Sequence, residues 1–541
     1  MITTLILFLT VLLFIGCSEN NVAGGTSIDK GIVALGEWKV EGVSQKGPFI
    51  IGSTVSVLEL GGNSLLQTGK VFKSSIKSDK GDFSVMGPAL ASQYAMIEVT
   101  GYYRNEITGL KSTSPLTLNA IVDISDREKA NVNLLTHLEY ERVKHLVSEG
   151  MSVKDAKAQA QREILETMAM SESKEAFEDL NIFEAGDANA KLLAISILLQ
   201  RKEDVAGFTE SLAKFSMELA QNGSWNDSAT RTSIADWAYE MERLNKFEEI
   251  RNNILGWGIS DSLPDFEKYI TLFWADNYGL GKCSDSNKGH TAPNTNPLSR
   301  WATNNPLSQW PKKRFICDGS RWINIADYKL EFETMTDDRD GKTYKTFHID
   351  EQVWMAQNLN YDYQTEITHS TCYNDTQEYC DLYGRLYTLA AAVDSAGLFG
   401  SEGLGCSNSN IDCNLEESSR GVCPKGWHLP SKGEWEQLFT SIGDIATIET
   451  IMKAENEICR DNDGLNNIHK EICERNSGLV FRAFDEEYPN ASFWTSTIIR
   501  IDDEAFPTRL VFPIYTDFFS PTPSFRSVPI EYGISVRCVM D

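Results

Sequence analysis

Cysteine is the residue type whose number and placement in this chain point most directly to chemistry. Of the 11 cysteines, Cys17 closes an apolar N-terminal stretch and all the others lie from Cys283 onward. An even number of late cysteines in an exported chain predicts disulfide bonds. The sequence leaves their connectivity open, but close spacing favours four pairs and leaves a fifth. The predicted pairs are Cys283 with Cys317, Cys372 with Cys380, Cys406 with Cys413, Cys459 with Cys473, and Cys423 with Cys538.

Metal binding and catalysis are the alternative uses of these thiols. Zinc sites commonly contain Cys-x-x-Cys pairs, which do not occur here, and the 7 histidines are not at ligand spacing. The late cysteines have many Asp and Glu neighbours, which raise a thiol pKa, whereas a catalytic thiol needs a lowered one. The chain also has no Gly-x-Ser-x-Gly, His-Glu-x-x-His or phosphate-loop motif. We therefore predict no catalytic residue and no cofactor, and we favour a protein that is not an enzyme.

Three carboxylates close together in the sequence form a candidate cation site. Asp337, Asp338 and Asp340 lie in a short run that ends in Gly341. Turns rich in carboxylate oxygens bind calcium, so calcium is the candidate cofactor here. The alternative is a plain turn, in which Asp340-Gly341 supplies the geometry for a hairpin of strands over 343–349 and 352–355. We favour the turn.

The start of the chain has the outline of a bacterial lipoprotein signal peptide. Residues 3–16 are almost wholly apolar and end at Gly16-Cys17. This stretch is too short to span a bilayer as a helix, which needs about 20 such residues. Small Gly16 gives a signal peptidase access to the backbone, and Cys17 then carries the lipid. An ordinary cleaved signal peptide with an incidental cysteine is the alternative.

Residues 18–35 are polar and contain glycine, which predicts a flexible tether. The expected location is therefore the outer membrane or cell surface, with acyl chains on Cys17 as the membrane anchor. The formal net charge of −27 argues against nucleic acid as a partner, because a phosphate backbone is bound through clustered Lys and Arg.

The hydrophobic period changes along the 541 residues and predicts a multidomain α+β protein. From 36 to 128, short alternating stretches between turn residues predict a β-sandwich. Within it, residues 68–71 ahead of 81–85 are loosely similar to carboxypeptidase-regulatory-like modules. From 129 to 278 the period is helical and predicts a bundle of five or six helices.

Polar residues mark two helix starts in the predicted bundle. Ser152 and Asp155 form a start of the capping-box type. Asn226 or Asp227 is expected to cap a later helix and not to bind calcium. After the bundle, residues 279–330 are polar and contain several prolines, which predicts a small disulfide-closed spacer before a terminal domain over 331–541.

Four motifs of the terminal domain carry a family resemblance. In chain order they are VWMAQNLNY (353–361), YGRLYT (383–388), GVCPKGWHLPSKGEW (421–435) and SVRCV (535–539). Together they resemble the Fibrobacter succinogenes major paralogous domain, a large set of surface lipoproteins. A remoter similarity, over 429–436 and 533–539, is to C-type-lectin-like and formylglycine-generating-enzyme domains. That similarity implies a lectin-like fold, in which a long-range bridge occupies the place of Cys423 with Cys538.

Tryptophans in these motifs are the candidate ligand-binding residues. An indole combines a large apolar face with one N–H group. Most are expected in the core and one as a ligand platform, with Trp354, Trp427 and Trp494 as the candidates. His428 is expected in the core or at a strand end, not as a base.

The leading functional hypothesis is a non-catalytic binding or adhesion protein, with polysaccharide or another surface protein as its ligand. Insoluble plant polysaccharide follows from the resembling family's cellulose-degrading bacterium. The alternatives are a formylglycine-generating-enzyme-like oxidoreductase, which requires a reactive cysteine pair, and a purely structural surface protein.

Overall fold

The computed structural model describes residues 31–302 apart from 63, 126 and 202–203, and then 314–406, 415–443, 480–481, 490–501, 504–513, 524–527 and 532–541. The fold is mixed α+β and divides into two compact units, Met1–Trp274 and Ala275–Asp541. No helix in these described ranges is both long enough and apolar enough to cross a bilayer. The predicted lipid anchor Cys17 and most of the predicted tether lie outside the described residues.

The first unit begins with two small sheets. Their strands are β1 (Trp38–Gln45), β2 (Thr54–Leu60), β3 (Gln67–Ser75), β4 (Asp82–Gly87), β5 (Tyr94–Gly101), β6 (Leu116–Asp123) and β7 (Val132–Asn133). One sheet is antiparallel in the order β3-β2-β5-β6, and the other has the order β4-β1-β7. The alternating residues that predicted strands are buried, since Val55, Val57, Ile97 and Val99 have no exposed surface.

Helices follow the strands in the described part of this unit. They are α1 (Leu134–Ser148), α2 (Val153–Thr167), η1 (Phe177–Asp179), α3 (Asp187–Gln200), α4 (Val205–Asn222), α5 (Ser228–Arg243), α6 (Phe247–Leu255) and α7 (Glu267–Asn277), the last of which runs into the second unit. The predicted caps are confirmed. The Ser152 hydroxyl accepts the Asp155 backbone N–H at 3.1 Å, and the Asp227 carboxylate accepts that of Thr230 at 2.9 Å.

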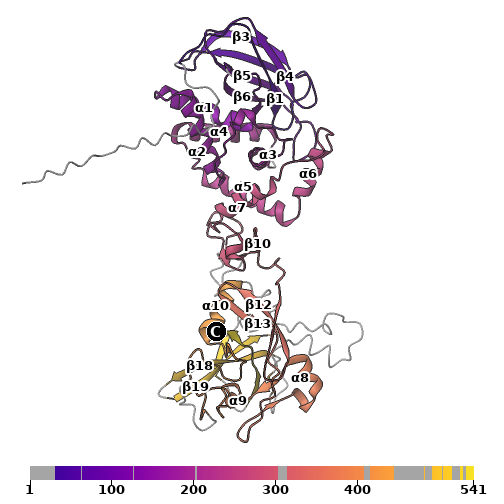
Figure 1. Cartoon of the computed structure of the whole chain (residues 1–541), viewed down its shortest axis with the longest axis vertical. Coiled ribbons are helices and arrows are strands. Elements are labelled where there is room, and N and C mark those ends of the chain that lie inside the picture. The colour runs from indigo at the N-terminus through magenta and orange to yellow at the C-terminus, as the bar shows by residue number, and fades with distance from the viewer. Residues whose placement is uncertain are drawn as a thin grey trace, which may run out of the picture. The chain divides into compact units, whose positions relative to one another are not determined.

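The four-stranded sheet and the helices of the first unit share a core. Tyr94 and Met96 of β5 and Ile121 of β6 pack in one cluster with Val143 of α1 and Ala156 of α2. Figure 1 shows α1 and α2 beside the strands of this sheet. The segments predicted as a β-sandwich and as a separate bundle therefore lie in one compact unit.

The second unit contains three sheets within the described ranges. Its strands are β8 (Thr291–Pro293), β9 (Arg314–Cys317), β10 (Trp322–Asn324), β11 (Glu333–Thr336), β12 (Thr343–Ile349), β13 (Gln352–Met355), β14 (Ser370–Thr371), β15 (Leu386–Tyr387), β16 (Trp427–His428), β17 (Val480–Phe481), β18 (Asn490–Ile501), β19 (Glu504–Pro513), β20 (Ser524–Ser527), β21 (Gly533–Ser535) and β22 (Val539–Met540). The sheet orders are β10-β9-β8, β11-β12-β13-β22-β16 and β14-β15-β21-β18-β19-β20, with β17 pairing to β21. The helical segments are η2 (Asp285–Asn287), η3 (Tyr373–Asp375), α8 (Gln377–Tyr383), α9 (Leu389–Ala392) and α10 (Lys432–Ile442).

Disulfide bonds cross-link the second unit, as predicted. The structure confirms Cys283–Cys317, Cys372–Cys380 and Cys423–Cys538. Cys406 is also disulfide-bonded, whereas Cys413, Cys459 and Cys473 lie outside the described residues. The Cys423–Cys538 bond lies next to the pairing of β16 with β22, so it ties the motif around Trp427 to the last strand.

Candidate binding site

The tryptophans predicted as ligand platforms lie in the core of the second unit. Trp354 and Trp494 have no exposed surface, and Trp427 keeps only 7%. The Trp354 ring lies 4.5 Å from that of Trp435 between centroids, and the Trp494 indole N–H donates to the Tyr387 backbone oxygen at 2.7 Å. A fully buried side chain cannot contact a ligand. The interpretation of Trp354 and Trp494 as platforms is therefore wrong, and Trp427 packs in the same core cluster as Trp494.

The three carboxylates predicted as an alternative calcium site do not converge on a shared cation position. Asp337 is 1% exposed, and its two carboxylate oxygens accept Arg339 Nε at 2.8 Å and Nη2 at 2.7 Å. Asp340 forms an ion pair with Lys342, and Asp338 is exposed. In the part of the chain that is described, no group of three His, Cys, Asp or Glu side chains is placed to hold a metal ion.

The same residues form the predicted turn. The Asp337 backbone N–H donates to the Lys342 carbonyl at 2.8 Å, and the Gly341 N–H donates to the Asp337 carbonyl at 2.8 Å. Gly341 has φ +74°, a conformation that favours glycine. The turn leads into β12 and β13, whose bounds match the predicted hairpin. Asp337 and Arg339 thus serve the turn itself.

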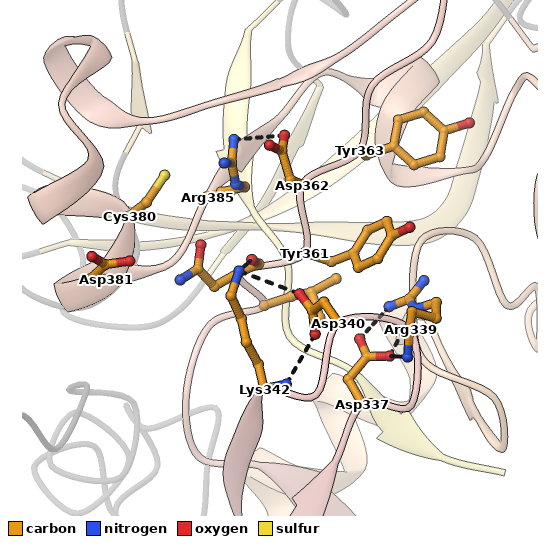
Figure 2. Close-up of polar contacts among 12 residues, drawn as sticks. Asp337, Arg339, Asp340, Lys342, Tyr361, Asp362, Tyr363, Cys380, Asp381 and Arg385 are labelled. Carbon is orange, nitrogen blue, oxygen red and sulfur yellow. Dashed lines mark hydrogen bonds and ion pairs between the residues drawn. The ribbon is translucent and has the colours of Figure 1, made fainter.

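Aromatic rings hold the guanidinium of this turn in place. Arg339 lies 4.0 Å from the Tyr361 ring centroid and 4.5 Å from that of Phe399, and it donates to the Val422 carbonyl at 2.9 Å. Figure 2 shows Arg339 between Asp337 and Tyr361. Arg339 therefore links the turn to three other segments of the chain, and this fixes the edge from which Lys342 extends.

A cavity of about 400 Å³ opens beside this edge. Three segments line it: the turn and the start of β12, the segment that follows β13, and the end of α8. Its lining residues are Gly341, Lys342, Thr343, Tyr344, Gln357, Asn358, Asn360, Cys380, Asp381, Leu382, Tyr383 and Gly384. Ligand pockets for small molecules typically have volumes of roughly 300–1,000 Å³, so the cavity is large enough for one or two sugar rings.

Amide side chains form the inner wall of the cavity. The Asn358 amide group donates to the Tyr383 carbonyl at 2.8 Å, and its oxygen accepts Arg537 Nε at 3.0 Å. The side-chain orientation of Asn358 is thereby fixed. Asn360 is 9% exposed and donates its backbone N–H to the Tyr344 hydroxyl at 3.0 Å. Its side-chain oxygen is buried and accepts no hydrogen bond from the described residues.

The end of α8 forms the opposite wall, where Figure 2 shows Cys380 and Asp381. The Cys372–Cys380 disulfide anchors this short helix, and Gly384, with φ +76°, ends it. A Cβ atom on Gly384 would lie 2.7 Å from the Asn358 Cβ, so only glycine allows the two walls to approach this closely. Asp381 is exposed and accepts the Gln377 amide at 2.7 Å.

Three tyrosines lie in a row along η3 and α8. The Tyr373 and Tyr379 rings meet edge to face at 5.5 Å, and Tyr379 stacks on Tyr383 at 6.3 Å. Tyr383 lines the cavity, and Tyr373 and Tyr379 are half-buried. The cavity with its polar amides thus borders an aromatic surface that is partly accessible.

His428 has acidic partners that its sequence position did not indicate. Its Nδ1 lies 2.8 Å from Asp541 Oδ1, and its Nε2 lies 2.7 Å from Glu434 Oε1. Both neighbours are acceptors, so both ring nitrogens carry protons. Burial lowers the pKa of His428, but the hydrogen bonds to the two carboxylates outweigh burial and raise it. His428 is a doubly paired cation and does not act as a free base.

Sequence motifs contained the signal for the cavity without identifying its residues. Gln357, Asn358 and Asn360 lie in the motif 353–361, and Tyr383 and Gly384 open the motif 383–388. The motifs drew the prediction to their tryptophans and not to these amides. The amides line a cavity only because the two motifs lie side by side in the fold. The tyrosine row lies mostly outside both motifs.

One comparison with known proteins supports the resemblance seen in the sequence. Residues 347–540 match the family model described as Fibrobacter succinogenes major domain. The match lies within the second unit, contains most of the cavity wall and covers less than half of the chain. No curated protein and no solved structure matches the chain. The resemblance to lectin-like and formylglycine-generating-enzyme domains gains no support from these comparisons.

Proposed function

We propose that this protein is a surface-associated, non-catalytic binding protein whose second unit recognises neutral polysaccharide at the cavity beside α8. The family match supports a surface-associated role. The observation that carries the binding proposal is a cavity lined by the amide residues Gln357, Asn358 and Asn360 and bordered by the tyrosine row. Polar groups placed at the wall of a cavity fix the orientation of a ligand through hydrogen bonds.

Sugar rings match both parts of this site. One face of a pyranose presents C–H groups that pack on an aromatic ring, and its hydroxyls bond to amides and carboxylates. Tyr379 provides the ring, and the exposed Asp381 and the amide residues of the cavity wall provide the polar groups. A net charge of −27 repels polyanions, which favours a neutral polymer.

Anchoring at the surface completes the proposal. Cys17 carries the lipid in the outer membrane, and residues 18–35 act as the tether.

The oxidoreductase alternative needs a reactive thiol, whereas the described cysteines from Cys283 onward are disulfide-bonded. A thiol assay on the unfolded, unreduced protein separates the two functions, because a pair of free cysteines would favour the oxidoreductase.

The test of the proposed function is depletion of the full mature chain from solution by a panel of insoluble polysaccharides, with and without a calcium chelator. Saturable depletion by a neutral polymer, unchanged by the chelator, is the expected result. Depletion by no polymer would contradict the proposal and favour a protein ligand or a structural role. Loss of depletion with chelator would restore calcium as a cofactor.

A further inference from the structure

We infer that Lys46 and Glu106 form a modification site, at which the two side chains condense to an intramolecular amide bond. In the first unit, Lys46 Nζ lies 2.6 Å from Glu106 Oε2, and neither side chain has any exposed surface. An ammonium and a carboxylate removed from water together lose much of their hydration. Condensation removes both charges from the core.

In the described structure, the Lys46 nitrogen has a single carboxylate partner and lies among aromatic rings. Glu106 is the one acceptor bonded to Nζ among the described residues. The ring centroids of Phe208 and Tyr103 lie 5.2 Å and 5.8 Å away. Burial lowers the pKa of Lys46, although Glu106 opposes this shift. A neutral amine carries the lone pair that attacks a carbonyl carbon.

A second buried lysine in the same unit provides the contrast. Lys157 Nζ lies 2.5 Å from Glu139 Oε1 and 3.2 Å from Glu178 Oε2, and it donates to the Ile121 carbonyl at 2.9 Å. Burial lowers its pKa, but the two carboxylates outweigh burial and raise it. Lys157 therefore remains a satisfied ammonium and serves as an internal control.

The hydrogen bonds of Glu106 suit a carboxyl group whose carbon is attacked by a nucleophile. Its Oε1 accepts the Ser196 hydroxyl at 2.6 Å and the Gly47 backbone N–H at 3.0 Å, whereas its Oε2 faces Lys46. Two donors on one oxygen stabilise the negative charge that develops when a nucleophile attacks the carboxyl carbon. Oε2 is then the leaving oxygen.

The step balances without a further reactant. One proton moves from Lys46 Nζ to Glu106 Oε2 and gives a neutral amine and a carboxylic acid. Nζ attacks Cδ, and Oε1 takes up the negative charge between Gly47 and Ser196. A second proton then passes from nitrogen to Oε2, the Cδ–Oε2 bond breaks, and one water leaves as the amide forms. No electron is gained or lost.

The bond would give the first unit a covalent staple that its composition otherwise lacks. No cysteine occurs between Gly31 and Trp274, whereas the second unit has disulfides. The amide would join the residue after β1 to the segment between β5 and β6 and close a loop of 60 residues. Closing such a loop restricts the unfolded chain and stabilises the fold.

Peptide mapping of the unfolded, reduced mature protein after trypsin tests the proposal. The expected product is a branched peptide, in which residues 40–70 remain uncut at Lys46 and are joined to residues 105–111 with the loss of one water. Cleavage after Lys157 should proceed normally in the same digest. Complete cleavage after Lys46, with a free linear 105–111 peptide, would overturn the proposal and leave a buried ion pair.

Two variants serve as controls for formation of the amide bond between Lys46 and Glu106. Lys46→Arg cannot form the amide, so it should yield free 105–111 peptide and unfold at lower denaturant concentration than the parent protein. Glu106→Gln can form the same amide by releasing ammonia, so it should give a branched peptide of identical mass. A branched peptide in the Lys46→Arg digest would show that another residue is linked and would contradict the assignment.

Discussion

The Asp337 carboxylate and the Arg339 guanidinium form a two-point ion pair, at 2.8 Å and 2.7 Å, beneath the turn that borders the proposed binding cavity. Asp337 is 1% exposed, so this arginine is what makes its charge tolerable there. The pair links the turn to Tyr361 and Phe399 through the arginine's ring contacts. The carboxylate-rich turn that suggests calcium binding in the sequence thus contains its own cation, the Arg339 guanidinium, which neutralises Asp337.

Removing that cation should destabilise the second unit. We expect Arg339→Ala to lower the free energy of unfolding by about 3–5 kcal/mol, because it leaves a buried carboxylate without a charged partner. Arg339→Lys should retain only part of the free energy of unfolding that Arg339→Ala loses, since an ammonium cannot form two parallel hydrogen bonds. Urea unfolding measures both. Arg321→Ala, at an exposed pair, is the matched control and should change stability little. Equal effects at the two arginines would contradict this role.

His428 should make the stability of the second unit depend on pH above neutrality. Its pKa is raised in the folded state from the ordinary 6.5, so its contribution is fully present below pH 6.5 and is lost as pH rises through the raised value. Hydrogen exchange of peptides around β16, followed from pH 6 to 9, measures this loss. In His428→Gln the exchange-derived stability should no longer fall over that range, and an unchanged slope would contradict the assignment.

Glu139 should make the stability of the first unit fall with rising pH as well, but in a more acidic range. Burial raises its pKa to about 7, while Lys157 opposes the shift. The folded state therefore binds a proton that the unfolded state releases near pH 4.5, so stability falls as pH rises from 4.5 to 7. Glu139→Gln should flatten the profile measured by hydrogen exchange in α1 and α2. Glu141→Gln, at a half-exposed carboxylate on the same helix, serves as the control and should leave the profile as it is.

The two described disulfides of the terminal domain should contribute unequally. Cys423–Cys538 joins residues 115 positions apart, and Cys372–Cys380 joins residues 8 apart. The chain-entropy model assigns about 4–5 kcal/mol to a loop of the longer kind and less to the shorter one. Replacing both cysteines of each pair by serine and measuring urea unfolding tests this order. A larger loss from the 372–380 pair would contradict it.

Local chemistry in the sequence predicted local structure well. Asp340-Gly341 predicted the turn and the hairpin of β12 and β13 that follows it. Ser152, and Asn226 or Asp227, marked two helix starts. Each of these depends on residues within a few positions of one another. Cysteine spacing predicted the three described disulfides for a related reason, because short loops close readily and the remaining pair followed by elimination.

Long-range packing is what the sequence did not reveal. The helical period over 129–278 was predicted, but the contact of α1 and α2 with β5 and β6 in one core was not, since an apolar helix face does not specify its partner. The cavity likewise requires Asn358 to meet Gly384 and Tyr383 across the fold. His428 gained its partners in the same way, from α10 and from Asp541.

The central claim is that the cavity beside α8 binds polysaccharide, and the most direct test is to compare single-residue variants on the polymer that depletes the parent protein. Tyr379→Ala and Asp381→Ala, which remove one ring and one exposed carboxylate, should each weaken binding about tenfold, as the loss of a stacking contact or of a hydrogen bond to a charged group does. Tyr102→Ala, at an exposed tyrosine of the first unit, should bind like the parent protein. Undiminished binding by both α8 variants, with their folding intact, would contradict the account and place the ligand elsewhere.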